Sequence, residues 1–254
     1  MLSPQDTPVS QGLGRTRATG VIHEWLTITM ASATAQGLVS NEGDSFTYAS
    51  ADMASETRRQ NRVQTFVSTW KVAGITNAAQ AYGRTNEFAL RKMIAMKRWK
   101  TAVEVDLLDN SASGAGSSGS GNGRLMNGLR AQDGLSATAA TTGSAPIDEE
   151  NLNSLLQLMY EQEAAADNVV CAPYVKRQVS RLVGAGPGIP LIIENGAKIL
   201  SNSIDIYDTD FGRVQFIPSI RLSVKSEVIA YRNEYNKLAV LREPSARATP
   251  NDGD

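Results

Sequence analysis

The residue types that most often carry out catalysis are scarce in this sequence. His23 is the only histidine in the chain, so a Ser-His-Asp triad would have to use it. It lies in an apolar run beside Trp25, where a structural histidine is the more common interpretation. No GxSxG segment supplies a serine nucleophile. A hydrolase that uses His23 therefore stays only as a distant alternative, and we predict that the protein is not an enzyme.

The single cysteine, Cys171, excludes an internal disulfide and a zinc site built from cysteines. It stands in the apolar run VVCAP, which is typical of a buried and unreactive thiol. We therefore expect no metal site and no cofactor. A chain without disulfides also fits a reducing compartment.

Three short motifs resemble ligand-binding loops but lack the parts that such loops need. The tract GSSGSGNG has no Lys-Ser or Lys-Thr ending and follows a predicted helix rather than a strand. GAGPGIP, residues 184–190, has a proline where a dinucleotide site begins its helix. TDFG, residues 209–212, lacks the other kinase motifs, so we interpret it as a tight turn between two strands.

Charged and aromatic residues near the predicted strands and the long helix remain as candidates for binding another chain. Arg58, Arg59 and Arg62 could hold carboxylate or phosphate groups of a partner, and a solvated charged face is an equally good interpretation. The predicted contact residues between subunits are Arg58, Arg59, Arg62, Trp70, Arg91, Lys92 and Arg98.

The composition is that of a soluble, folded protein. Of its 254 residues, 41% are hydrophobic and 20% charged, and no run is long enough to span a membrane. The first residues lack the basic and apolar regions of a signal peptide. Basic residues outnumber acidic ones by 8 to 4 in residues 81–130, whereas acidic residues outnumber basic ones by 16 to 11 in residues 131–254. This distribution suits subunits that pair basic with acidic surfaces, and it is too weakly basic for a dedicated nucleic-acid-binding domain.

The longest predicted element is a helix over residues 85–110, which contains no proline or glycine. Thr85 or Asn86 can cap its start, and Glu87 in the first turn complements the helix dipole. Its apolar residues recur at helical spacing, so we expect this stripe to pack against a sheet of the same subunit. The stripe consists of Ala89, Met93, Met96, Val103 and Leu107.

Two alternating stretches, residues 20–30 and 63–74, predict strands on either side of a long polar segment. We expect them to form a protruding hairpin, which is marginal by itself and would be stabilised by another chain. Residues 1–19 are rich in Pro, Gly, Ser and Thr, so we expect an extended arm rather than part of a core. Residues 245–254 are expected to be disordered.

The second half of the chain predicts a mixture of helices and strands. One helix begins after Asp148 and another at Pro173, with a buried strand over residues 168–173 between them. Strands and helices do not alternate, so the sequence favours an α+β fold over a doubly wound parallel sheet. The first helix carries the stripe Leu152, Leu155, Leu156, Met159 and Tyr160, and the second carries Val175, Val179, Leu182 and Val183. Further strands are predicted at residues 203–210, 211–219, 227–233 and 235–243.

The order of these parts resembles tailed-bacteriophage major capsid proteins of the HK97 fold. The resembling stretches are SPQDTPVSQGLGRTRATGVIHEW, RRQNRVQTFVSTWKVAG and GRTNEFALRKMIAMKRWKTAVEVDLLDN, followed by GRLMNGL, DFGRVQFIPS and EVIAYRNEYNKLAVLRE. Together they span most of residues 3–243. Their order and spacing, more than any single motif, carry the resemblance.

The resemblance implies a division of the chain into five parts. Residues 1–19 would be an N-terminal arm, 20–78 the extended E-loop hairpin region, and 79–110 a peripheral domain with a spine helix. Residues 111–240 would form an axial domain, with part of its strands in the peripheral domain, and residues 241–254 a C-terminal tail. Only REPSARATPNDGD follows Leu241, so we expect an abbreviated chain or a small peripheral sheet.

The resemblance also implies a function without chemistry. Hexamers and pentamers of the chain would assemble in the bacterial cytoplasm into the icosahedral head shell of a virion and enclose double-stranded DNA, with weak and nonspecific contact to that DNA. The other partners implied are portal, scaffolding and decoration proteins, and no membrane is implied. The basic side of the long helix would face neighbouring subunits or the shell interior. An encapsulin-like compartment, which has the same fold and a protein cargo, stays the nearest alternative.

Overall fold

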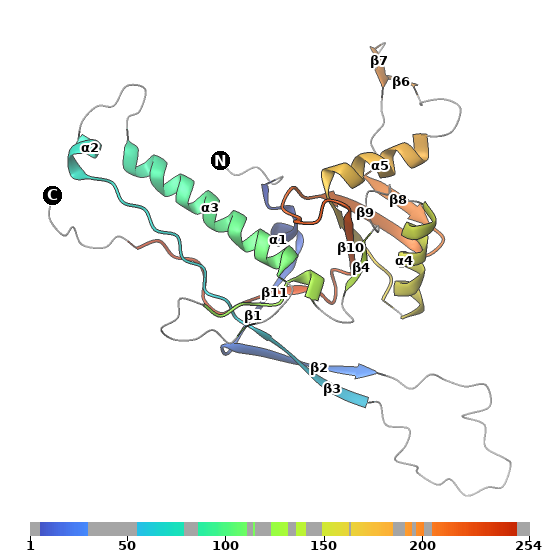
Figure 1. Cartoon of the computed structure of the whole chain (residues 1–254), viewed down its shortest axis with the longest axis horizontal. Helices are drawn as coiled ribbons and strands as arrows, with labels where there is room; N and C mark the ends of the chain where they lie inside the picture. The colour runs from blue at the N-terminus through green and yellow to red at the C-terminus, as the bar shows by residue number, and fades with distance from the viewer. Residues whose placement is uncertain are drawn as a thin grey trace, which may run out of the picture.

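The structure is a computed structural model in which a sheet covered by helices forms one part of the molecule, while a long helix and a hairpin extend away from it (Figure 1). Our predictions for the segment between the hairpin strands, for most of the Gly/Ser tract, for GAGPGIP and for the end of the chain lie outside the residues that it describes. The described residues are 6–29, 55–78, 86–110, 114, 123–131, 136–140, 149–162, 164–184, 191–194, 197–200 and 205–247.

A five-stranded mixed sheet forms the body of the molecule. β10 (Glu227–Tyr231) runs antiparallel to β4 (Ser136–Ala140) on one side and to β5 (Asn168–Cys171) on the other. β5 pairs in parallel with β9 (Gly212–Pro218), and β8 (Ile206–Thr209) is the antiparallel edge strand beyond it. The α+β prediction and four of these strands are confirmed. The exception is β4, which was not predicted because its Ser, Ala and Thr residues resemble a polar loop.

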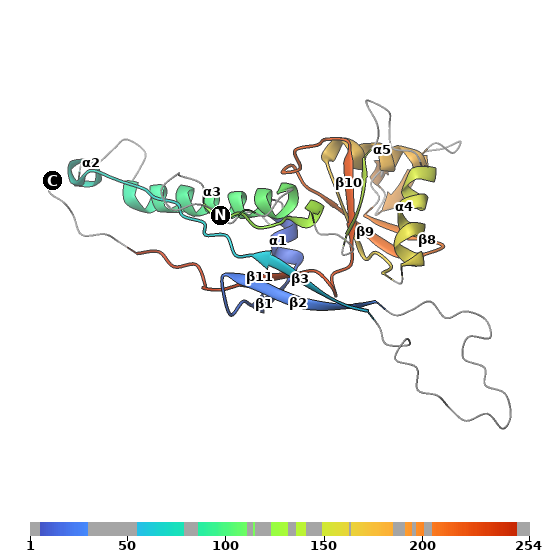
Figure 2. The same ribbon diagram turned by 60° about the horizontal axis from the view of Figure 1, so that its bottom comes forward.

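Both faces of this sheet are covered, which explains why the strands β5 and β10 are buried at every position. In β5, Val169 and Cys171 belong to one hydrophobic cluster and Val170 to the other. β10 divides its residues in the same alternating way. Figure 2 shows the helices α4 and α5 on one side of the sheet and α1 and α3 on the other. Their bounds are α4 (Glu149–Glu161), α5 (Pro173–Gly184), α1 (Pro8–Gly12) and α3 (Glu87–Asp109).

The two helices over the first face largely match their predictions. The predicted stripe of α4 is buried except for Tyr160, which is exposed and whose ring lies 5.7 Å from that of Phe211. In α5, Val175 and Val179 are buried as predicted. The expected cap Asp148 and the side chains of Leu182 and Val183 lie outside the described set.

The TDFG motif forms the turn between β8 and β9, as predicted. The hydroxyl of Thr209 donates a hydrogen bond to the carbonyl of Gly212 (2.8 Å) and accepts one from the N–H of Phe211 (3.3 Å). Gly212 has a φ of 130°, a conformation that side chains disfavour. The motif is therefore built for chain reversal.

The long helix α3 is confirmed, but the expected packing of its stripe is wrong. The side chain of Asn86 caps the helix by accepting a hydrogen bond from the N–H of Ala89 (2.8 Å). Of the apolar stripe, Leu107 is buried and Val103 is half-buried, whereas Met93 and the rest of the N-terminal part are exposed. The reason is reach, because the sheet and its loops cover only the C-terminal end of the helix (Figure 1).

The N-terminal segment corrects a second expectation, since residues 6–18 contribute to the core. Val9 and Leu13 are buried in the same cluster as the end of α3. β1 (Gly14–Arg17) then pairs in parallel with β11 (Lys237–Val240), the last predicted strand. The polar composition concealed the two apolar anchors, which by themselves are too few to establish a periodicity.

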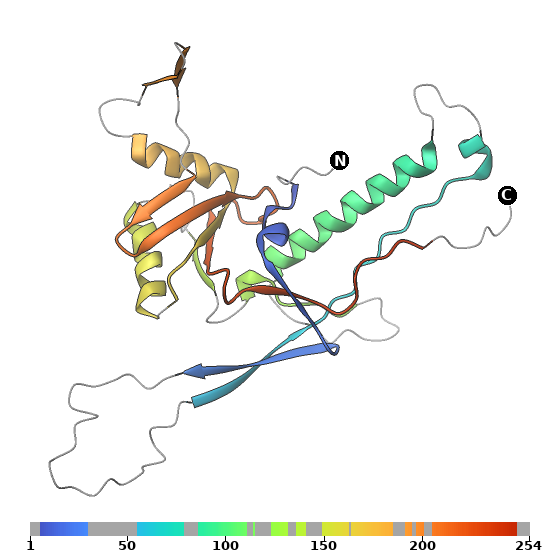
Figure 3. The same ribbon diagram turned by 180° about the vertical axis from the view of Figure 1, so that it is seen from behind.

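The predicted hairpin exists, with its second strand earlier in the chain than expected. β2 (Ile22–Thr29) pairs with β3 (Ser55–Arg62) in antiparallel register, so the three arginines lie within the strand. Residues 63–73, here called the strap, form no strand and run extended beside α3 (Figure 3), followed by α2 (Gly74–Ala78). A separate small hairpin pairs β6 (Leu191–Glu194) with β7 (Ala197–Leu200).

Candidate assembly surfaces

The last turns of α3 carry three acidic side chains and no basic one in the final turn. Acidic groups near the C-terminus of a helix are unfavourable for the helix dipole, so they need partners elsewhere. Each of the three holds a different segment of the chain. We call this group the α3 joint; it consists of Glu104, Asp106 and Asp109.

Glu104 holds the N-terminal segment. Its side chain is 0% exposed, and its two carboxylate oxygens accept hydrogen bonds from the N–H groups of Val9 (2.9 Å) and Ser10 (2.8 Å). These are first-turn N–H groups of α1, which have no partner inside their own helix. Burial, together with the nearby Glu104 carboxylate, raises the pKa of Tyr231 to about 12.

Asp106 holds the strap. The side-chain NH2 of Gln64 donates a hydrogen bond to the Asp106 carboxylate (2.6 Å), and the side-chain oxygen of Gln64 accepts one from the N–H of Met126 (3.1 Å). Farther along α3, the indole N–H of Trp99 donates to the carbonyl of Phe66 (3.2 Å). The Trp70 ring meets the Phe88 ring edge-on at 6.2 Å. Side chains of the helix α3 thus supply the hydrogen bonds that a neighbouring strand would supply in a sheet. The side chains of residues 66–72 alternate as predicted, with one set half-buried and the other exposed.

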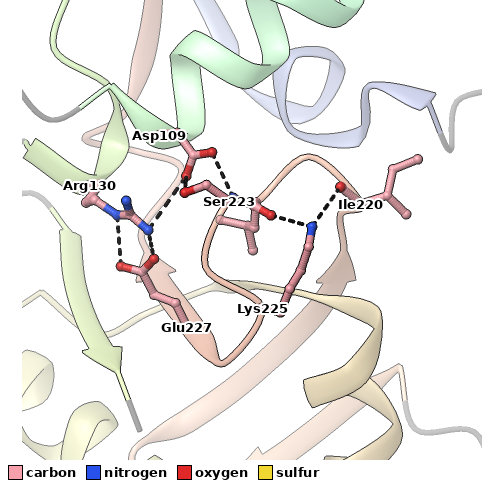
Figure 4. Close-up of polar contacts among 7 residues, drawn as sticks. Asp109, Arg130, Ile220, Ser223, Lys225 and Glu227 are labelled. Carbon is pink, nitrogen blue, oxygen red and sulfur yellow. Dashed lines mark hydrogen bonds and ion pairs between the residues drawn. The ribbon is translucent and has the colours of Figure 1, made fainter. Parts of the chain in front are cut away.

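Asp109 connects the helix to the sheet (Figure 4). Its carboxylate accepts hydrogen bonds from the N–H (2.8 Å) and the hydroxyl (2.9 Å) of Ser223. It also lies 3.6 Å from the guanidinium of Arg130, which binds the buried Glu227 at the start of β10 through two nitrogens. Lys225 folds back on the same loop and donates to the carbonyl of Leu222 (2.6 Å). The arrangement fixes the end of α3 to the sheet.

A glycine completes the joint by permitting a close approach of two backbones. A Cβ atom on Gly128 would lie 2.7 Å from the carbonyl oxygens of both Asp106 and Leu107. The N–H of Gly128 donates to the carbonyl of Asn110 (2.9 Å). Only glycine fits here without a backbone shift.

The hairpin has one open face on which apolar side chains alternate with charged ones. Ile22, Leu26 and Ile28 alternate along β2 and are all exposed, Leu26 by 63%. The register places Arg58 and Arg62 on this same face, directly across from Leu26 and Ile22. The body of the subunit leaves this face uncovered, so it is available to another molecule.

Arg58 has a partner within its own hairpin, and this limits the expected role of the arginines. Its guanidinium pairs with the Glu24 carboxylate, whose hydrogen bond and charge raise the pKa of Arg58. Arg59 lies on the opposite face, across from Trp25. Among the described residues, neither Arg59 nor Arg62 forms an ion pair.

The other four predicted contact residues lie apart from the hairpin, along the strap and the N-terminal half of α3. Trp70 is half-buried against Phe88, and Arg91 pairs with Glu87 one turn away (2.8 Å). Lys92 and Arg98 are exposed, without an ion pair in the part of the chain described here. The exposed residues Met93, Ile94 and Met96 lie among these basic residues and were not predicted as a surface. Their exposure follows from the short reach of the sheet, which a helical pattern alone cannot reveal.

His23 and Cys171, the two residues whose side chains could take part in catalysis, are poorly placed for it. His23 is half-buried with its ring 6.0 Å from that of Trp25. Cys171 is fully buried, and burial raises its pKa to about 12, so it is unreactive, as predicted. None of the helices in the described residues combines the length and apolar character that a membrane span requires.

One of the comparisons with known proteins, the match to a family model, agrees with the expected family. A search among curated proteins gave no significant match. A solved structure of the capsid of the cyanophage P-SCSP1u is similar, with 10% sequence identity and a TM-score of 0.43, over 83% of this chain and 62% of that one. A family model for the SU10 major capsid protein matches residues 1–254. Because this match covers the whole sequence, the chain belongs to the SU10 major capsid protein family.

Proposed function

We propose that copies of this chain assemble into the icosahedral head shell of a tailed phage and enclose double-stranded DNA. The observation that carries the proposal is the uncovered apolar surface of the subunit. The hairpin face around Leu26 and the α3 face around Met96 expose several large apolar side chains and belong to extensions that the subunit itself does not cover. Such surfaces are unfavourable in a monomer and are stabilised when neighbouring copies bury them.

Within this proposal, the fold is of the HK97 type. The hairpin β2–β3 corresponds to the E-loop, α3 to the spine helix, and the five-stranded sheet with α4 and α5 to the axial domain. The strap, α3 and the pair β1–β11 make up the peripheral domain. Support comes from the order of these parts along the chain and from the α3 joint, which fastens the extensions to one another.

Hexamers and pentamers of the chain are the proposed units of the shell. Each contact is modest in area, and their number makes the shell stable. Arg59, Arg62, Lys92 and Arg98 would pair with acidic groups of a neighbouring subunit. Trp70 would contact the same neighbour. Arg58 and Arg91 would act within their own subunit first, because each already has an acidic partner there. Portal, scaffolding and decoration proteins would complete the head, and DNA contact would be weak.

Electron microscopy of the purified chain tests the proposal. We expect closed icosahedral shells, and shells isolated from infected cells should contain double-stranded DNA. Shells that contain a packaged enzyme and no DNA would favour an encapsulin-like compartment instead. Failure to form shells or capsomers under any assembly condition, with the other phage head proteins present, would contradict the proposal.

Charge reversal on the hairpin gives a sharper test. The double variant Arg59→Glu and Arg62→Glu should reduce the yield of shells and leave the unfolding temperature of the subunit nearly unchanged, because both side chains lack partners within the described residues. Arg58→Glu is the matched control, since it breaks only the exposed pair with Glu24 and should affect assembly less. Equal loss of shells in the double variant and in Arg58→Glu would show that assembly also needs the ion pair between Arg58 and Glu24.

A further inference from the structure

The two helices on the sheet have opposite charges. α4 carries Glu149, Glu150 and Glu161 and no basic residue. α5 carries Lys176, Arg177 and Arg181 and no acidic residue. Both pack on the same face of the five-stranded sheet, through one shared hydrophobic cluster. The helical layer of the subunit is thus divided into an acidic and a basic half.

The outward face of α4 combines acidic groups with an apolar side chain. Glu150, Leu158 and Glu161 follow one another at helical spacing on the side away from the sheet, with Ser154 and Gln157 between them. Leu158 is 55% exposed, although it lies next to the fully packed Met159. We call this surface the acidic face.

The outward face of α5 is its counterpart. Tyr174, Arg177 and Arg181 are spaced by three and four residues and are all exposed. The guanidinium of Arg177 lies over the Tyr174 ring at 5.6 Å, which fixes the aromatic side chain beside the charge. We call this surface the basic face.

The charges on both faces interact, among the residues that the structure describes, only with uncharged neighbours on their own helix: Arg177 with the Tyr174 ring, and the Glu161 carboxylate with the amide of Gln157, which donates a hydrogen bond to it (2.8 Å). In the described residues, Glu150, Glu161, Arg177 and Arg181 form no ion pair. The charged residues that flank them are engaged elsewhere: Lys176 pairs with Asp205 (3.2 Å), and Glu149 accepts a hydrogen bond from the Tyr207 hydroxyl (3.2 Å). Each face therefore presents two charges and one large apolar group to another molecule.

We propose that the acidic face of one copy docks on the basic face of a second copy. This inference rests on the proposed assembly of the chain into a shell. Glu150 and Glu161 would approach Arg181 and Arg177, and Leu158 would be covered by the Tyr174 ring. Because the contact joins two different surfaces, every copy keeps one of each for the next neighbour, and the contact can repeat around a ring.

A second copy fits the two faces better than a nucleic acid does. A polyanion over α5 would pass close to α4, which packs on the same side of the sheet, and its acidic residues would repel it. A nucleic acid backbone would also leave Leu158 exposed. One copy docked on each face satisfies the acidic charges, the basic charges and both apolar groups.

A charge-swap series tests the contact. The first variant is Glu150→Lys with Glu161→Lys, the second is Arg177→Glu with Arg181→Glu, and the third combines all four changes. We expect each of the first two to lower the yield of shells by about tenfold or more, because a lost contact is multiplied over all copies. The combined variant should restore the yield, since both faces are then complementary again. Circular dichroism and thermal unfolding confirm that each variant folds.

The matched control exchanges an exposed ion pair on the same body. Asp208 and Arg213 lie 3.5 Å apart on β8 and β9, with side chains about three-quarters exposed. Asp208→Lys with Arg213→Glu should leave the shell yield unchanged. The control separates loss of the specific contact from a general effect of reversing two surface charges on this body.

A mixing experiment keeps the inference testable even if the chain alone makes no shells. The first variant has a basic α4 and the second an acidic α5, so each should bind the other. Sedimentation of the mixture should show a heterodimer that neither variant forms alone. The inference is overturned if the combined variant folds but does not recover the shell yield, or if the mixture contains no heterodimer. Shells of the wild-type chain would still support the proposed function in either case. Intact shells that have lost packaged DNA in the second variant would assign the basic face to DNA and equally overturn it.

Discussion

The sheet body and the extensions use similar sequence patterns and treat them differently. In the body, the stripe of α4 is buried beneath the subunit's own surface, with Leu156 2% exposed. On α3, a weaker stripe at the same helical spacing leaves Met96 47% exposed. The body is therefore a self-sufficient core, whereas the subunit itself leaves the N-terminal half of α3 and the hairpin uncovered. An amphipathic pattern reports that a surface will be buried, but not by which chain.

The largest difference should appear when an apolar side chain is shortened in the body. Leu156→Ala should lower the free energy of unfolding of the subunit by about 3 kcal/mol, because it removes buried methyl groups and leaves a cavity. Urea denaturation followed by circular dichroism measures the change. A loss below about 1 kcal/mol would mean that this core is loosely packed and that the contrast with α3 is overstated.

Opening the α3 joint should cost nearly as much. Glu104→Ala removes the acceptor of two N–H groups and should destabilise the subunit by about 2–3 kcal/mol. Hydrogen exchange should rise first in residues 8–17, which Glu104 holds. Glu104→Gln is the control, because it keeps one oxygen acceptor and the shape of the side chain, so its loss should be smaller. Equal losses would show that packing, and not the hydrogen bonds, anchors the segment.

Alkaline pH should weaken the body through two buried acids. Burial raises the pKa of Cys171 from 9.0 to about 12 and that of Tyr231 from 10.0 to about 12, so both stay neutral in the fold while the unfolded chain ionises. Their contribution is complete below pH 9 and is lost as the pH rises toward 12. At pH 10.5 the loss from Cys171 should be about 2 kcal/mol and that from Tyr231 about 1 kcal/mol. Cys171→Ala should flatten the dependence, which denaturation at several pH values measures.

The smallest effect on the subunit should come from the extensions. Met96→Ala and Leu26→Ser should change its free energy of unfolding by less than about 0.5 kcal/mol, because both side chains are largely in solvent already. The same variants should lower the yield of shells in sedimentation assays. A subunit that is strongly destabilised by either change would place these residues in a monomer core and remove the contrast.

Local patterns were sufficient to predict most of the body of the fold from sequence, with β4 as the exception. The strands β5, β9 and β10 and the helices α4 and α5 each carry their own periodicity, and their partners lie on the same sheet. The strap shows the limit of prediction from local patterns. Its alternating residues correctly predicted two different faces, yet the partner is a helix held through Gln64 and Trp99, and alternation does not distinguish a strand from a helix as neighbour.

The candidate sites were predictable only where charge and spacing coincide in one segment. Arg58 was predicted to lie near a hairpin, but its pairing with Glu24 depends on the register of β2 with β3, which alternation alone does not give. The role of Glu104 was hidden because its partners, Val9 and Ser10, are more than ninety residues away. The available signal in the sequence was an acid between two apolar residues in the middle of a helix, since such a group requires a partner when it is buried.

The pairing of β1 with β11 also bears on how the chain is made. Gly14 finds its partner at Lys237, so this strand leaves the ribosome long before the residues that complete its sheet. Its neighbour α1 waits in the same way for Glu104. Contacts of such long sequence separation form late and slowly in folding. The N-terminal segment should therefore be the last part to dock during synthesis, and it stays exposed to proteases and chaperones until then.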